Sequence, residues 1–390
     1  MNNFFEIEIK NNRIYGLDIL RALAILFVVV EHGQYLLPKK LKSLHEIFVF
    51  DGVSIFFVIS GFLIGGILIK LLDKNQPTKK LLVDFWIRRW FRTLPNYFLI
   101  LFLLIGIRLI INDDFTIWTV RKYFIFAQNL FYQHPLFFPE AWSLSVEEWF
   151  YLIVPICIFA TIKYFKVESK HAILFVSGII LILTLSFRYY RYLNVDIDSI
   201  VEWDFRFRKQ VFTRLDSLMF GVICGVVQFY HEKTWLKYKY TFLLFGLSIF
   251  ISTKLFFLLG YISPGGFYNC VLSFSVTSLS TSFLLPYLSN MKRGKGYLHQ
   301  GFTTISLISY SMYLLNLSVV QLSLINKIPW SNFIENIYIV VILKYFIYWI
   351  LTIFGSVIIY KYYEVPLMNL RDTEKVKRFV AKILYNKWHK

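Results

Sequence analysis

The first apolar stretch of the chain carries three ionisable side chains that could do chemistry, Asp18, Arg21 and His32. Ionisable groups at membrane depth are costly, so each is a functional candidate by default. Arg21 and His32 stand eleven positions apart. At 3.6 residues per turn this is about three turns, so one helix face presents both, roughly 16 Å apart. Asp18 precedes Arg21 by three residues, a spacing that predicts an ion pair.

Histidine suits general-base chemistry because its unperturbed pKa, about 6.5, lies near neutral pH. His32 is therefore our candidate base. A plainer alternative stays open, in which His32 is hydrogen-bonded for structural reasons only, or marks the membrane boundary together with Glu31.

Two adjacent carboxylates, Glu147 and Glu148, lie in another apolar stretch that begins near Trp142. A carboxylate at this depth can orient an imidazole, stabilise its cation or bind the hydroxyls of an acceptor. The alternative is a structural ion pair with an intramembrane arginine such as Arg214, which precedes Asp216 at the start of a later apolar stretch.

The composition indicates that a membrane positions these residues. Of 390 residues, 57% are hydrophobic and 20% are aromatic, more than a soluble core needs. The apolar runs are long and do not alternate with polar residues, which favours helices over a barrel. The predicted fold class is all-α, a polytopic integral membrane protein with about ten transmembrane helices.

Each predicted span is an apolar run bounded by charged residues, proline or glycine. The spans lie near residues 17–37, 48–70, 95–111, 142–162, 171–192, 211–230, 241–259, 268–288, 304–323 and 335–360. Lysine and arginine gather between the second and third spans and after the last one. Because cytoplasmic segments retain such residues, we predict that both termini are cytoplasmic. The basic stretch at 188–210 opposes this orientation: either a span is miscounted or its arginines bind something.

We divide the chain into a membrane domain at 1–370 and a basic cytoplasmic tail at 371–390, where apolar residues recur at helical spacing among lysines, as in a membrane-surface anchor. The first apolar stretch lacks a small-residue cleavage site, so we expect it to remain as a transmembrane helix.

Other classes of protein fit poorly. The lysine and arginine residues that give the net charge of +18 lie between apolar spans and do not form a soluble basic face. No nucleic-acid partner is therefore expected. Three isolated cysteines, Cys157, Cys224 and Cys270, suggest neither a metal site nor a disulfide framework.

Seven blocks occur in order along the chain, and together they resemble the membrane acyltransferase 3 family. The blocks are GLDILRALAILFVVVEHG, which holds Arg21 and His32, then GVSIFFVISGFLI at 52–64, FWIRRWFRTLPNY at 85–97, AWSLSVEEWFYLIVP at 141–155, RLDSLMFG at 214–221, SYSMYLLN at 309–316 and YYEVP at 362–366. Two positions depart from the pattern: many family members carry Asp where this chain has Ser54, and His where it has Asn316.

The resemblance implies an O-acyltransferase of the inner (cytoplasmic) cell membrane. Its donor would be acetyl-CoA or another acyl-CoA, and its acceptor a hydroxyl of a surface polysaccharide, a lipopolysaccharide O-antigen or a glycolipid precursor. The partners implied are the lipid bilayer, the carbohydrate acceptor and envelope-assembly proteins. Some relatives carry a fused extracytoplasmic esterase-like domain, for which we expect no room in this chain.

The resemblance also assigns roles to residues. His32 and Glu147 are the expected catalytic residues. Arginine binds phosphate through forked, charge-assisted hydrogen bonds, so we expect Arg89 and Arg92 to bind coenzyme A, although such residues also serve only to fix topology. The remaining expected contacts to donor or acceptor are Asp18, Arg21, Glu148 and Arg214.

Two other functions remain possible from the sequence. A transporter or flippase also places buried Arg, Glu and His along several helices. A non-catalytic partner in envelope polysaccharide assembly is compatible with the departures at Ser54 and Asn316.

Overall fold

Long apolar segments become helices here because hydrocarbon offers no partner for backbone N–H and C=O groups. The computed structural model describes residues 7, 9, 13–38, 41–42, 47–111, 114–130, 133–374, 376 and 378. Within these residues the regular elements are helices and no strand occurs, which confirms the all-α prediction. Most of the tail predicted at 371–390 lies outside the described residues.

Eight helical segments of the described chain are long and apolar enough to cross a membrane. They are α3 (Gly52–Lys74), α4 (Lys79–Ile111), α5 (Ala141–Phe165), α6 (Ser169–Asn194), α10 (Lys239–Leu258), η4 (Tyr268–Leu272) with α11 (Ser273–Leu288), α12 (Gly296–Leu315) with η5 (Asn316–Leu324), η6 (Ile325–Lys327) and η7 (Trp330–Asn332), and α13 (Ile337–Ile359) with η8 (Tyr360–Glu364) and α14 (Val365–Leu370).

Two further predicted spans also form helices. The first, α1 (Tyr15–Gly33), includes the charged residues Asp18, Arg21 and Glu31, and the second, α8 (Leu215–Tyr230), has only 16 residues. Short elements connect the spans: η1 (Gln34–Leu36), η2 (Ile117–Ile125), α7 (Ile200–Trp203), η3 (Asp204–Arg208) and α9 (Glu232–Lys237). Since length and composition select eight segments, the number of ten and the side of each terminus stay predictions.

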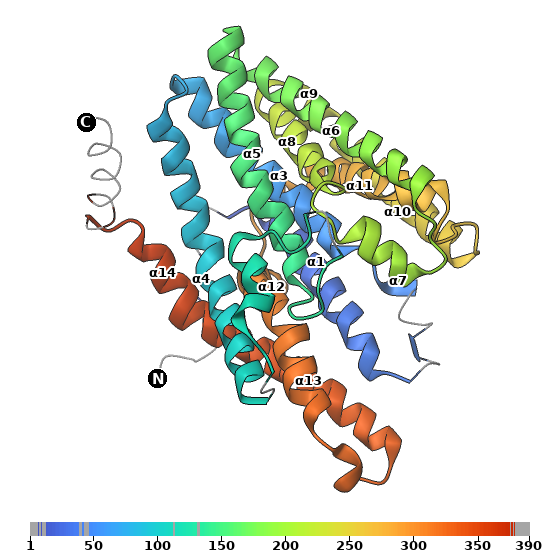
Figure 1. Cartoon of the computed structure of the whole chain (residues 1–390). Coiled ribbons are helices and arrows are strands. Elements are labelled where there is room, and N and C mark those ends of the chain that lie inside the picture. The colour runs from blue at the N-terminus through green and yellow to red at the C-terminus, as the bar shows by residue number, and fades with distance from the viewer. Residues whose placement is uncertain are drawn as a thin grey trace.

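The helix α1 occupies a central position, packed against α3 and α12 (Figure 1). On one side of this trio, α8 packs on α3 and is covered by α6, while α10 pairs with α11. On the other side lie α4 and α14, and α5 stands between α4 and α6 (Figure 1). The helix that carries Arg21 and His32 is thereby enclosed by its neighbours.

The helix α4 begins earlier than the predicted span at 95–111. It starts at Lys79 and continues through Pro95, which places the cluster Arg88, Arg89 and Arg92 on a helix instead of in a loop. A proline inside a membrane helix is tolerated where neighbouring groups bond to the backbone. Near this proline, Tyr363 Oη of η8 donates to the Pro95 carbonyl oxygen over 3.4 Å, which ties η8 to α4.

The basic stretch at 188–210 is engaged inside the molecule. Arg188 is fully buried and donates to Asp216 Oδ2 over 2.8 Å. Arg208 and Lys209 both contact the Asp204 carboxylate, at 3.1 and 2.5 Å. Arg188, Arg208 and Lys209 thus bind carboxylates inside the molecule, so their position in this stretch does not depend on which side of the membrane it faces.

Helices α3 and α8 come together at glycines. A Cβ atom added to Gly61 would lie 1.9 Å from the Leu218 carbonyl oxygen, and one added to Gly221 would lie 2.1 Å from that of Val58. Small residues allow membrane helices to approach in this way, because van der Waals contact drives their association.

Gly61→Ala should therefore destabilise the protein. We expect a loss of about 1–3 kcal/mol, the usual cost of overpacking, and a lower melting temperature of the detergent-solubilised chain. Gly66→Ala, on the same helix, is the matched control because a Cβ there meets nothing within 4 Å. Equal melting temperatures for the two variants would contradict the close approach.

Candidate functional site

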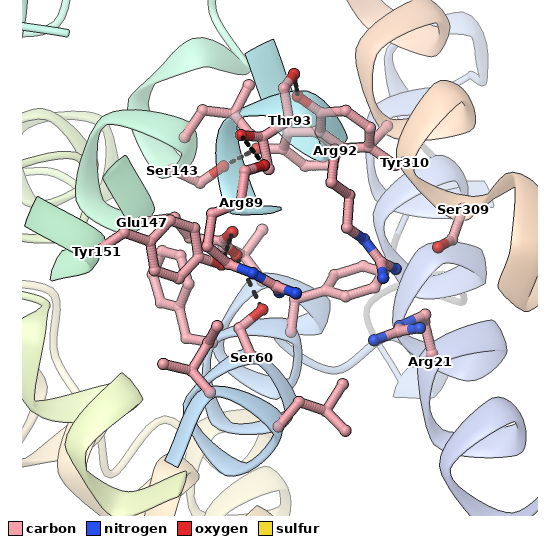
Figure 2. A pocket seen from close by; sticks show the side chains of 17 residues that line it. Arg21, Ser60, Arg89, Arg92, Thr93, Ser143, Glu147, Tyr151, Ser309 and Tyr310 are labelled. Carbon is pink, nitrogen blue, oxygen red and sulfur yellow. Dashed lines mark hydrogen bonds between the residues drawn. The ribbon is translucent and has the colours of Figure 1, made fainter. Parts of the chain in front are cut away.

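A cavity of about 120 Å³ opens between α1, α3, α4, α5 and α12 (Figure 2). Its lining residues are Arg21, Val53, Phe56, Phe57, Ser60, Leu63, Ile64, Arg89, Arg92, Thr93, Ser143, Leu144, Glu147, Tyr151, Ser309, Tyr310 and Tyr313. Four of the eight predicted site residues meet here: Arg21, Arg89, Arg92 and Glu147. They come from three helices, which shows why no single sequence block reveals the cavity.

Three guanidinium groups converge on the cavity. Figure 2 shows the side chain of Arg92 descending toward that of Arg21, with Arg89 beside them. None of these three guanidinium groups donates a hydrogen bond or forms an ion pair with a residue that the structure describes. Three cations share the cavity with one lining carboxylate, that of Glu147, so a net positive charge remains that attracts an anion.

The carboxylate of Glu147 faces the same cavity from α5. It accepts hydrogen bonds from Tyr151 Oη over 2.8 Å and from Ser60 Oγ over 3.2 Å. These two donors hold the carboxylate within the field of Arg21 and Arg89 without direct contact.

His32 lies near the opposite end of α1 and does not line the cavity. Its Nδ1 atom is 2.5 Å from Asn316 Oδ1. The Asn316 amide nitrogen donates to the carbonyl oxygens of Met312 and Tyr313, both over 2.8 Å. Because the amide nitrogen is used in this way, Oδ1 must accept a hydrogen bond from Nδ1–H, and the lone pair of His32 Nε2 remains available as a base.

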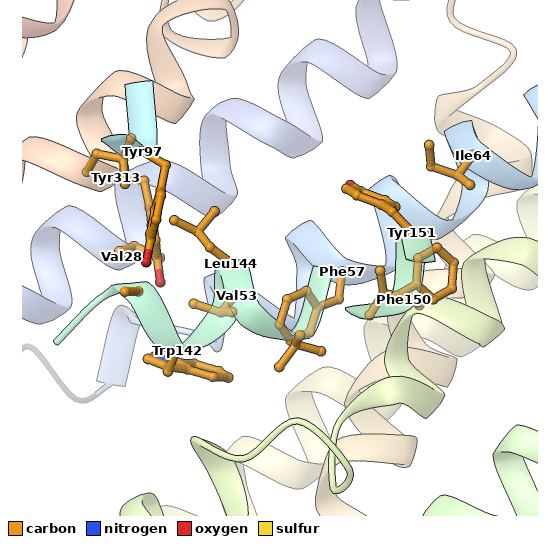
Figure 3. Close-up of a cluster of buried hydrophobic side chains, with 14 of the residues drawn as sticks. Val28, Val53, Phe57, Ile64, Tyr97, Trp142, Leu144, Phe150, Tyr151 and Tyr313 are labelled. Carbon is orange, nitrogen blue, oxygen red and sulfur yellow. The ribbon is translucent and has the colours of Figure 1, made fainter. Parts of the chain in front are cut away.

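A cluster of buried hydrophobic side chains packs beside the cavity (Figure 3). Val53, Phe57 and Leu144 belong both to the cavity wall and to the main buried core. Tyr313 lines the cavity three residues before Asn316, and its hydroxyl lies 2.7 Å from Ser143 Oγ. Apolar surroundings of this kind strengthen the electrostatic interactions of the charged groups that line the cavity.

A second charged cluster lies on the His32 side, where α3 begins. The Asp51 carboxylate caps α3 by accepting from Ser54 N over 3.2 Å and from Ser54 Oγ over 2.5 Å. Arg214 Nη2 donates to the same Ser54 Oγ over 2.5 Å, and Arg208 Nη2 lies 3.5 Å from Asp51 Oδ1. Ser54 stands where the resemblance leads us to expect Asp, and Asp51 brings a carboxylate to it from three residues upstream.

The ion pair predicted between Asp18 and Arg21 needs correction, whereas the expected contact of Glu148 with a substrate stays a prediction. Asp18 does not pair with Arg21, because Arg13 Nε donates to Asp18 Oδ2 over 2.9 Å and Ser306 Oγ donates to its other oxygen over 2.8 Å. Glu148 does not line the cavity and accepts from Thr93 Oγ1 over 2.7 Å. Among the described residues, both carboxylates are thus held by structural partners.

Sequence reasoning missed several participants. Ser60 and Tyr151, which hold Glu147, carry no distinctive local pattern. Asp51 was visible as a polar residue directly before an apolar run, a typical N-cap position. Asn316 stood out only as a departure from the family pattern, whereas its contact with His32 requires the three-dimensional fold.

Comparison with known proteins supports the resemblance seen in the sequence. A family model described as an acyltransferase domain matches residues 14–361. A Staphylococcus aureus (strain COL) protein, provisionally named O-acetyltransferase SACOL0978, is 28% identical over 388 residues, which cover 92% of this chain and 58% of that protein. O-acetyltransferase OatA of Staphylococcus aureus (strain NCTC 8325 / PS 47) is 27% identical over 382 residues, 90% of this chain and 57% of OatA.

The chain thus spans less than two thirds of the length of these relatives. No solved structure matches it.

Asp51→Asn tests the cluster beside α3. Burial works against ionisation of this carboxyl, but Arg208 and Arg214 prevail and lower its pKa from 3.8 to about 2. Such a shift corresponds to about 2 kcal/mol of stability at neutral pH. Because the folded-state pKa is depressed, this stability is fully present above pH 3.8 and is lost as the pH falls through 2.

We therefore expect Asp51→Asn to melt at a lower temperature than the wild type at pH 7. Wild-type and variant melting curves recorded from pH 7 downward should keep a constant separation until about pH 4 and then converge. Identical stability at pH 7 would show that the two arginines do not depend on Asp51.

Proposed function

This chain belongs to the acyltransferase family, and from that premise we propose that it is an O-acetyltransferase of the cytoplasmic membrane, which moves an acetyl group from acetyl-CoA to a hydroxyl of a surface glycan. The observation that carries the proposal is the cavity where the three cations Arg21, Arg89 and Arg92 meet beside a single lining carboxylate, that of Glu147, to which none of them is directly bonded. Relatives named as O-acetyltransferases support the same reaction.

The arginine cluster suits the phosphates of coenzyme A. Guanidinium groups bind phosphate oxygens through paired, charge-assisted hydrogen bonds. Arg92 is exposed while Arg21 is half-buried, so the cluster leads from the surface toward the interior. A cavity of about 120 Å³ is too small for the whole donor, for which pockets of about 300–1,000 Å³ are usual. The proposed contact is therefore with one end of the donor.

The donor's reach fits the separation of the two ends of α1. Phosphates at Arg21 and a thioester near His32 would lie roughly 16 Å apart along the helix. The flexible arm of coenzyme A, which joins its phosphates to its thioester, is an extended chain that can bridge such a separation. Val53, Phe57 and Leu144 belong to the buried core and line the cavity, so entry of the arm toward His32 would require these side chains to rotate.

His32 then serves as the general base. Its Nε2 atom accepts the proton of the acceptor hydroxyl as the hydroxyl oxygen attacks the acetyl carbonyl carbon. The carbon–sulfur bond breaks, and the imidazolium returns its proton to the departing thiolate. Asn316 keeps Nδ1–H directed at its own oxygen throughout, so Nε2 stays aimed at the substrate.

Glu147 acts on the donor side in this proposal. Glu147 lines the cavity with the arginines and is distant from His32. We therefore propose that it balances the positive charge of Arg21 and Arg89 and does not orient the imidazole. The donor side is proposed to face the cytoplasm, where acetyl-CoA is made and where the basic segments around α4 are retained.

His32→Ala should abolish transfer. We expect label from radioactive acetyl-CoA to reach the glycans of membranes that contain the wild-type chain, with turnover about 10²–10⁴ times lower for the variant, the usual share of general-base catalysis. His171→Ala, at an exposed position on α6, is the matched control and should behave like the wild type. Equal transfer by His32→Ala would remove the proposed base, and flux of an intact glycan without thioester cleavage would favour a transporter.

Arg89→Gln and Arg92→Gln should weaken donor binding. Each change removes a cation from the cavity, so we expect the KM for acetyl-CoA to rise about tenfold or more while the KM for the acceptor is unchanged. Arg88→Gln is the matched control, because Arg88 is the neighbour of Arg89 on α4 but does not line the cavity. A similar rise for all three variants would indicate a general effect of surface charge.

A further inference from the structure

A second hollow opens on the outer wall of the bundle, where α4 ends against η5. We name it the lateral cleft. Its lining residues are Leu104, Ile107, Arg108, Ile111, Leu136, Phe137, Ser318, Leu322, Ser323 and Lys327. The cleft has a volume of about 50 Å³. Since one water molecule needs about 10–15 Å³ of such space, the cleft can hold a group of several heavy atoms, such as a phosphate.

Two cations from separate elements line the lateral cleft. Arg108 lies in the last turn of α4, and Lys327 ends η6. Neither side chain has a hydrogen bond or an ion pair with any residue in the described part of the chain. A cation in the last turn favourably opposes a helix dipole, which would explain either residue alone. It does not explain why cations from two helices line one hollow. The hydroxyls of Ser318 and Ser323, which also line it, donate within the protein, to Glu140 Oε2 and to the Ser318 carbonyl oxygen.

The rest of the lateral cleft is apolar and continues onto an exposed apolar surface. Ile111 and Leu136 in its wall are 57% and 70% exposed. Beyond them, α4 exposes Phe102, Leu103, Leu109 and Ile110. In a membrane protein such a surface faces hydrocarbon, so a ligand held in the cleft can keep an attached chain in the bilayer.

The lateral cleft is linked to the His32 end of the molecule through η5. Ser318 in the cleft donates to the buried Glu140 carboxylate from its backbone N over 3.0 Å and from its Oγ over 2.5 Å. Two residues before it, Asn316 holds His32. Asn316 and Ser323 are seven residues apart on η5, which is at most about 10 Å along the helix.

From this arrangement we infer that the lateral cleft binds the phosphate of a lipid carrier whose attached glycan is the acceptor at His32. Arg108 and Lys327 bind phosphate oxygens, the apolar wall receives the carrier's hydrocarbon chain, and the glycan extends toward the imidazole. This inference rests on the proposed function and adds to it the acceptor class, a lipid-linked glycan in place of a finished surface polymer.

Binding of a long-chain polyisoprenyl monophosphate tests the inference directly. The full-length chain in phosphatidylcholine nanodiscs would be titrated with the radiolabelled lipid, and bound label counted after capture of the protein. We expect saturable binding by the wild type and about tenfold or more weaker binding by the double variant Arg108→Gln, Lys327→Gln. The control Arg121→Gln removes a cation from η2, outside the cleft, and should bind as the wild type does.

Competition separates the sources of phosphate. Inorganic phosphate alone should compete poorly, since it lacks the hydrocarbon chain, and phosphatidylglycerol should compete weakly. If either competed as well as the isoprenyl phosphate, the cleft would be a general anion or phospholipid site and the acceptor assignment would be overturned. Undiminished binding by the double variant would overturn the site itself.

The binding assay is independent of acetyl transfer, so the two proposals fail separately. A wild-type chain that binds the lipid but never transfers acetyl to any acceptor contradicts the proposed function. A chain that transfers acetyl yet shows no saturable lipid binding contradicts the lateral cleft alone.

Discussion

A charged side chain in a hydrocarbon-embedded bundle needs a partner, and this need organises the structure. Arg188 has Asp216, Arg208 has Asp51 and Asp204, and Arg13 has Asp18. Apart from Arg208 and Asp204, which both lie in η3, each pair connects separate elements or ties a connecting segment to a helix. Removal of one member would leave an uncompensated charge, which typically costs about 3–5 kcal/mol in a buried site. The pairs therefore hold the packing in place.

Because most buried charges are paired, the cations without an ion-pair partner at the two hollows are candidates for binding a ligand. Arg21, Arg89 and Arg92 face one cavity without such partners in the described chain, and Arg108 and Lys327 face the lateral cleft in the same condition. The first group lies toward the beginning of α1 and the second toward its end, where His32 is held. The molecule therefore has two separate anion-attracting sites, one at the cavity and one at the lateral cleft. The proposed reaction uses both, with the donor on one side and the lipid-linked acceptor on the other.

The sequence predicts the helical class and the family because long apolar runs and ordered blocks are local properties. Arg21, Glu147, Arg89 and Arg92 were identified for the same reason, and the structure adds their convergence. Partners were less predictable. The spacing of Asp18 and Arg21 favoured an ion pair, but Arg13, just before the helix, reaches Asp18 instead. Likewise, the contact of His32 with Asn316 joins residues 284 positions apart, beyond any periodicity argument.

The central claim is that donor and acceptor meet from opposite ends of the helix bundle. The most direct measurement uses proteoliposomes with the chain in one orientation, fixed by protease mapping of the basic segment around residues 74–80. Labelled acetyl-CoA is supplied on that side only, and glycan acceptor on the other side only. The account predicts acetylated glycan under this arrangement and none when the two compartments are exchanged. Transfer only when donor and acceptor share one compartment would contradict it.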